Sequence, residues 1–220
     1  MSIFIDKIIE AGGSMIPLAI CSIVSIAVII ERFVHLRKKN VINDEIVDAA
    51  CKKIRAEDLD GARELGKASD VVFGQVLYKG IEVHQIEGTE LEEALLETSA
   101  REMPRLEKFL NVLSLIGSIA PLLGLFGTVY GMILSFDEIA KESVDKELMA
   151  QGISVALITT GAGLVIAIPA IIANNYFRAR VDYFYTIVEE GILQIMRAYH
   201  LAGKETAEET PAAESTDGQD

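Results

Sequence analysis

The sequence "GISVALITTGAGLVIAIPAIIANNYF", residues 152–177, contains no Asp, Glu, Lys, Arg or His side chain. It belongs to an uncharged run, residues 150–177, that exceeds the roughly 20 apolar residues a helix needs to cross a bilayer. A second uncharged run covers residues 109–136, and a shorter one covers residues 15–30. These three runs predict an all-α membrane protein with three transmembrane helices.

The composition supports a membrane protein. Half of the residues are hydrophobic and the mean hydropathy is positive, although the formal net charge is −13. Much of the acid lies in polar segments such as the carboxyl-terminal "KETAEETPAAESTDGQD", which predicts a disordered acidic tail over residues 202–220. Cys21 lies inside the first span and Cys51 in a polar segment, so we expect two reduced thiols and no disulfide.

Basic residues near the span ends predict the orientation. They follow the first span, precede the second and follow the third, at Arg32, Arg37, Lys38, Lys39, Arg101, Arg105, Lys108, Arg178 and Arg180. The link between the second and third spans offers only Lys141 and Lys146. Because positive charge is retained on the cytoplasmic side, the amino terminus is expected outside and the carboxyl terminus inside.

The whole chain is predicted to divide into eight segments. These are an outer-face interfacial amphipathic helix (1–14), transmembrane helix 1 (15–36), a cytoplasmic helical region (37–108), transmembrane helix 2 (109–136), a short periplasmic link (137–149), transmembrane helix 3 (150–177), a cytoplasmic helical extension (178–201) and the tail (202–220). In the stretch before the second span, "TELEE" predicts a capping box with Thr89 as N-cap and Glu92 as its partner. Both the second and third spans are expected to extend as helices into the cytoplasmic region, with a kink at Pro104.

Each of the two longer spans has one face of small, weakly polar residues at helical spacing. In the second span this face holds Gly117, Pro121, Gly124, Thr128, Gly131 and Ser135, and in the third it holds Gly152, Ala156, Thr160, Gly163, Ala167, Ala170 and Asn174. Small residues let membrane helices approach closely, so the faces are consistent with ordinary packing seams. They are equally consistent with the lining of a lumen between copies of the chain, in which Pro169 would also shape the third helix.

Soluble-enzyme chemistry finds no support in the sequence. Three scattered histidines, two distant cysteines and no phosphate loop predict neither a catalytic site nor a metal or cofactor site. The second and third spans also lack the Asp, Glu or His that intramembrane proton relays use. If protons cross here, another chain must supply the acid.

Two stretches carry a family resemblance. "IAPLLGLFGTVYGMILSF", residues 119–136, followed after a polar link by "GISVALITTGAGLVIAIPA", residues 152–170, resembles the signature helices of the MotA/TolQ/ExbB proton channel family. "IERFVHLRKK" after the first span is also similar to that family. Three spans with an external amino terminus resemble ExbB most, and TolQ, rather than the four-span MotA.

The resemblance implies a homopentamer in the bacterial inner membrane around single-span ExbD- or TolR-like subunits that carry a protonatable Asp. It further implies that proton flow energises a TonB- or TolA-like transducer and so powers outer-membrane import. Thr128 and Thr160 match the threonines that face the partner aspartate. One position departs from the family, because "GISVAL" places Val155 where its members read G-I-A-E-A-L with a glutamate.

Three roles remain open on the sequence. The first is an ExbB-type energy-transducing subunit, and the second is a TolQ-like envelope-maintenance or a motility motor subunit. The third is a non-conducting membrane scaffold, which Val155 in place of the family acid permits.

Overall fold

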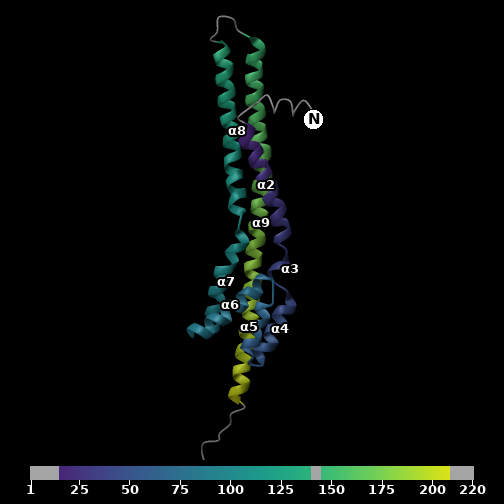
Figure 1. Cartoon of the computed structure of the whole chain (residues 1–220), viewed down its shortest axis with the longest axis vertical. Coiled ribbons are helices and arrows are strands. Elements are labelled where there is room, and N and C mark those ends of the chain that lie inside the picture. The colour runs from purple at the N-terminus through teal and green to yellow at the C-terminus, as the bar shows by residue number, and fades with distance from the viewer. Residues whose placement is uncertain (1–14, 140–144, 209–220) are drawn as a thin grey trace, which may run out of the picture. The chain divides into compact units, whose positions relative to one another are not determined.

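The computed structural model describes residues 15–139 and 145–208, and within these residues all regular structure is helical. The elements are α2 (Met15–His35), α3 (Lys38–Val41), α4 (Asp44–Arg55), α5 (Leu59–Lys67), α6 (Val72–Glu87), α7 (Leu91–Glu102), the 3-10 helix η2 (Met103–Glu107), α8 (Leu110–Ile139) and α9 (Lys146–Glu208) (Figure 1). The predicted all-α class is confirmed. The predicted interfacial helix at residues 1–14 lies outside the described residues.

The described chain forms two compact units. Unit 1 contains α2 as far as Val34 together with Lys108–Ala179, and unit 2 contains His35–Glu107 together with α9 from Arg180 onward. Three helices are long and apolar enough to cross a membrane, namely α2, α8 over Leu110–Asp137, and α9. Each of the three predicted spans falls on one of these helices.

The predicted continuation of the second span into the preceding helix is wrong. α7 ends at Glu102, η2 follows, and α8 begins only at Leu110. Two features interrupt the helix. Pro104 has no backbone N–H to donate to the preceding turn, and Phe109 adopts a φ of 67°, in the left-handed region that a helix does not use.

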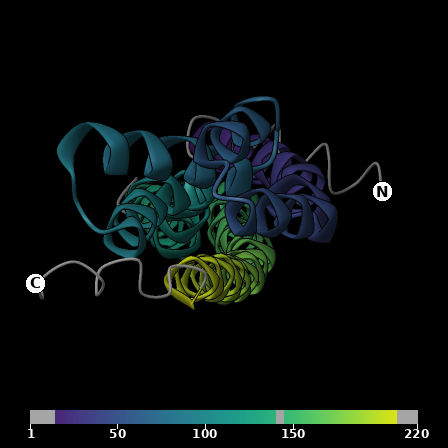
Figure 2. The ribbon, with the colours of Figure 1, turned by 90° about the horizontal axis from the view of Figure 1, so that it is seen from below.

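The third span does continue, because α9 is one helix from Lys146 to Glu208. It extends beyond residue 201, so residues 202–208 are helical rather than part of the predicted disordered tail. In unit 2 its apolar stripe is buried at Val181, Phe184, Val188, Ile192 and Ile195. Figure 2 shows the short helices of unit 2 gathered on one side of this part of α9, which is the side its stripe requires.

The predicted capping box at Thr89 is also wrong. The N-cap of α7 is Glu90, which makes no side-chain cap bond, and the buried Thr89 hydroxyl has no hydrogen-bond partner among the described residues. The Thr89 carbonyl oxygen instead lies 2.6 Å from Nδ1 of His84, which donates to it. Gly88, in the left-handed conformation at φ 68°, ends α6 and turns the chain, and this turn holds Thr89 away from the capping position.

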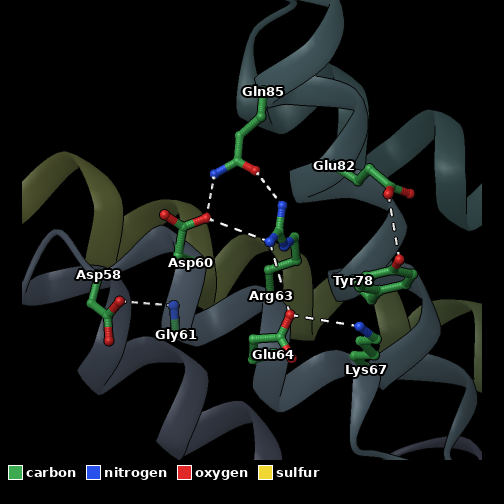
Figure 3. A network of polar contacts seen from close by, with 9 residues as sticks. All are labelled: Asp58, Asp60, Gly61, Arg63, Glu64, Lys67, Tyr78, Glu82 and Gln85. Atoms are coloured by element: carbon green, nitrogen blue, oxygen red, sulfur yellow. Dashed lines mark hydrogen bonds and ion pairs between the residues drawn. The ribbon is translucent and has the colours of Figure 1, made fainter.

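Polar side chains join α5 to α6 in unit 2 (Figure 3). Arg63 donates to Oε1 of Gln85 over 3.0 Å, and Gln85 donates through Nε2 to Oδ1 of Asp60 over 3.1 Å. Further along the same pair of helices, a methyl group on Gly66 would lie 2.7 Å from the Gly74 carbonyl oxygen. α5 and α6 therefore approach to backbone contact, and only glycine fits at Gly66.

Asp58 caps α5, and its contribution to stability is predicted to depend on pH. Its Oδ1 accepts from the Gly61 N–H over 2.7 Å, and its Oδ2 accepts from Lys53 over 2.9 Å. The Lys53 hydrogen bond first, and then the Gly61 N–H, hold the pKa of this carboxyl below its ordinary value. The stabilisation is therefore complete above the ordinary pKa and is lost as pH falls through the lower folded-state value.

We expect Asp58→Ala to lower the thermal midpoint of the detergent-solubilised chain at pH 7, with a difference from wild type that shrinks toward zero in acid. Far-UV circular dichroism across a pH series measures this difference. Asp48, exposed on α4, gives the matched control Asp48→Ala. A difference that persists unchanged at the acid end would show that the ionised cap is not its source.

Candidate functional site

The closest helix contact in unit 1 is an antiparallel seam between α8 and α9. A methyl group on Gly131 would lie 2.6 Å from the Gly152 carbonyl oxygen, and one on Gly163 would lie 2.5 Å from the Ala120 carbonyl oxygen. Both distances are shorter than real methyl contacts, so the two backbones touch. Glycine is therefore required along the seam because no side chain fits between the helices.

Most of the predicted small-face residues lie along this seam. The predicted residues that contact the opposite helix are Gly117, Gly124, Gly131, Ser135, Gly152, Ala156 and Gly163. Ala167 is buried on α9, whereas Pro121 is half-buried and Pro169 is exposed. The α8 contact face also includes Ala120 and Gly127, which the sequence reading left out.

The three threonines make different hydrogen bonds. Thr160 donates across the seam to the Gly124 carbonyl oxygen over 3.0 Å. Thr128, half-buried beside the seam, donates to the Leu125 carbonyl oxygen of its own helix over 2.7 Å. Thr159, which was not predicted as a site residue, is fully buried and donates to the Val155 carbonyl oxygen over 2.6 Å.

One further bond ties the seam at its other end. The Ser135 hydroxyl lies 3.0 Å from the Gly131 carbonyl oxygen and 3.1 Å from that of Met149 on α9. The hydroxyl groups of Thr128, Ser135, Thr159 and Thr160 thus donate to backbone carbonyls. Each of these hydroxyl oxygens retains the capacity to accept a further hydrogen bond.

Val155, which the resemblance matched to a glutamate, is buried and lines a cavity of about 540 Å³ near the start of α9. The cavity is also lined by Gln151 and Ser154, one and two positions from the predicted small face. Two carboxylates, Asp145 and Glu147, line the same cavity, and Gln151 and Ser154 are its uncharged polar members. The sequence reading did not single them out, since neither matches the small-residue spacing.

Charged groups mark the ends of the spans. Arg32, near the end of α2, is buried and pairs with Glu31, with 2.5 Å between Nε and Oε2. Its guanidinium carbon lies 5.5 Å from the centre of the Phe109 ring, at the break before α8. This stacking connects the end of the first span to the start of the second.

Metal-binding and nucleophilic groups are sparse. No cluster of three or more His, Cys, Asp or Glu side chains within residues 15–139 and 145–208 could hold a metal ion. Cys51 is a half-buried free thiol, and burial raises its pKa, which keeps it in the unreactive protonated form. Within residues 110–136 of α8 and 150–177 of α9, the polar groups are hydroxyls, amides and backbone carbonyls.

A sequence model described as the MotA/TolQ/ExbB proton channel family matches residues 68–190, more than half of the 220 residues. The chain belongs to this family. The matched range contains all of α8, the seam and the three threonines. The resemblance inferred from the two quoted helices is confirmed.

Relatives carry both ExbB and TolQ names. An ExbB-like protein of Synechocystis sp. is 29% identical over 198 residues, which cover 86% of this chain and 92% of that protein. The biopolymer transport protein ExbB of Pseudomonas putida is 32% identical over 193 residues, covering 83% and 57%. The Tol-Pal system protein TolQ of Pseudomonas aeruginosa is 41% identical over 106 residues, covering 46% of each.

The close contact along the seam predicts that even an alanine at Gly131 will lower the stability of the protein. In Gly131→Ala the new methyl group would meet backbone atoms of Gly152 and Ala156 at 2.6 and 3.0 Å, and neither can rotate away. We expect the free energy of unfolding to fall by about 1–3 kcal/mol. Titration of the purified chain with denaturing detergent, followed by circular dichroism, measures it.

Gly161→Ala is the matched control, since no heavy atom lies within 4 Å of a methyl group at that position on α9. It should leave stability unchanged or raise it slightly, because alanine favours the helix. Equal losses in the two variants would contradict the close approach of α8 and α9.

Proposed function

We propose that this chain is an ExbB-type subunit of a motor that uses the proton-motive force to power import across the outer membrane. The observation that carries the proposal is that the membrane-spanning parts of α8 and α9 contain hydroxyl groups but no charged side chain. Thr128 and Thr160 place hydroxyl oxygens in the middle of two apolar helices. No carboxyl, imidazole or amino group occurs over residues 110–136 or 150–177.

A proton relay through the membrane needs a group that titrates. In the proposed assembly this group is an aspartate on a single-span ExbD- or TolR-like partner, which several copies of the chain surround. The proposed assembly is a homopentamer in the bacterial inner membrane, with the amino terminus in the periplasm and the carboxyl terminus in the cytoplasm. A TonB-like transducer would use the resulting movement.

A TolQ-like role in envelope maintenance is the second candidate. The 41% identity to TolQ of Pseudomonas aeruginosa, over 106 residues, favours it. The longer alignment to ExbB of Pseudomonas putida, over 193 residues, supports the ExbB-type role. Both candidates use the same ion path and differ in the transducer.

Copy number and partner are tested first by native mass spectrometry of the chain purified with and without the product of its neighbouring gene. The expected species has five copies of the chain and one or two copies of a single-span protein with an intramembrane aspartate. An oligomer that binds no such protein would overturn the motor and favour a non-conducting scaffold.

Thr160→Val is predicted to abolish partner-dependent proton flux in proteoliposomes that hold the complete complex. Valine keeps the shape of threonine but loses the hydroxyl that bonds to Gly124. Interhelical hydrogen bonds in membranes contribute only about 0.6 kcal/mol on average, so the complex should still assemble. Native mass spectrometry checks assembly on the same sample.

Thr159→Val provides the matched control. It removes a hydroxyl from the adjacent residue, which is fully buried and bonds only within its own helix. We expect this variant to retain most of the flux. Normal flux in Thr160→Val, or equal loss in both variants, would remove Thr160 from the ion path.

A further inference from the structure

A short polar face lies at the start of α8. Asn111, Ser114 and Ser118 follow one another at steps of three and four residues, so these side chains share one side of the helix. Thr128 lies ten residues beyond Ser118, with Pro121 and Leu125 at the intervening steps. Ser118 and Asn111 are exposed and Ser114 is half-buried. Polar side chains within a span generally face water or protein rather than lipid. The face therefore occupies the start of α8, ten residues before Thr128.

This face ends at a cation. Arg178 on α9 donates from Nη2 to Oδ1 of Asn111 over 3.3 Å, and both side chains are exposed. Asn111 is neutral, and no carboxylate in the described part of unit 1 forms an ion pair with Arg178. The acid nearest to Arg178 along α9 is Asp182, four residues further on, and the hydrogen-bond partner of the guanidinium is the neutral Asn111.

An unsatisfied acceptor lies beside this cation. Asn174 precedes Arg178 by four residues, so the two side chains are neighbours on α9. Asn174 is only 7% exposed, and its Oδ1 has no hydrogen-bond partner among the described residues. A buried amide oxygen without a donor is costly, and a water molecule is the donor that commonly satisfies it. This end of the helix pair is therefore suited to hold water.

We propose that Asn111, Asn174 and Arg178 form the inner mouth of the ion path, where Asn174 holds water and Arg178 limits the passage of cations. The proposal rests on the function proposed above, because it names the inner end of the same path. A fixed positive charge at the end of an ion path opposes protons and other cations, as in pores that exclude them. Arg178 would thereby reduce proton leak that bypasses the partner carboxylate.

A charge-selective labelling experiment tests the mouth without a partner protein. The full chain carries Cys21→Ser and Cys51→Ser, and Ser118→Cys serves as the reporter on the polar face. Membrane vesicles opened to reagent on both sides are treated with a neutral and a cationic methanethiosulfonate of similar size. Their ratio of rates cancels the reactivity of the thiol itself, because both reagents attack the same thiolate.

We expect the neutral reagent to label Ser118→Cys, and the cationic reagent to react about tenfold more slowly than the neutral one. When Arg178→Gln is added to the Ser118→Cys variant, the cationic and neutral reagents should label at similar rates. Lys108→Gln is the matched control, since Lys108 is an exposed cation just before α8 that contacts the Phe109 ring, at 4.9 Å from its centre, and not Asn111. That variant should keep the tenfold difference.

Three results would overturn the proposal. Equal rates with Arg178 present would exclude a charge barrier, and an unchanged difference in Arg178→Gln would assign the barrier to another group. Failure of both reagents to label would place Ser118 against lipid. Proton flux through the complete complex is measured separately, so a complex without partner-dependent flux would sink the proposed function while the labelling ratio still decides the role of Arg178.

Discussion

The close approach of α8 and α9 is the constraint on which the candidate site depends. Lipid tails are as apolar as leucine, so burying side chains between membrane helices gains little, and packing and hydrogen bonds must hold the pair together. Glycines at Gly124, Gly131 and Gly163 bring the backbones into contact. Only at this separation can the Thr160 hydroxyl reach the Gly124 carbonyl oxygen on the neighbouring helix. The seam thereby fixes the height of the hydroxyls relative to each other.

Sequence reasoning predicted the spans and the seam well, for a local reason. Hydropathy over about 20 residues is a property of the segment alone, and small residues at steps of three and four identify a face without knowledge of its partner. The predicted face on α8 was nevertheless rotated away from the face that contacts α9. Its centre includes Ala120 and Gly127, while Pro121 and Thr128 lie to one side. Adjacent helical residues point about 100° apart, so spacing alone does not separate an alanine in the seam from the proline next to it.

Two wrong predictions, a continuous helix into the second span and a capping box at Thr89, both concern places where the chain changes direction. The pattern of apolar residues from Leu91 onward gives no sign of the left-handed Phe109, since a positive φ in a bulky residue is imposed by its surroundings. The ring of that residue stacks with Arg32, which is distant in sequence. The capping box failed for a similar reason, because Gly88 and His84 turn the preceding segment and engage the Thr89 backbone. These tertiary contacts are absent from any window of sequence.

The bonds made by the threonines constrain the protonation state of the proposed partner carboxyl. Thr128 and Thr160 already donate their hydrogens to carbonyl oxygens, so in this arrangement they can only accept. A protonated carboxyl can donate to them, whereas an ionised carboxylate gains nothing until a hydroxyl leaves its carbonyl. Burial in the span would also disfavour the ionised form of that carboxyl. In the proposed motor, release of the proton would therefore be coupled to turning a hydroxyl away from the backbone, at the helix pair whose spacing the glycines set.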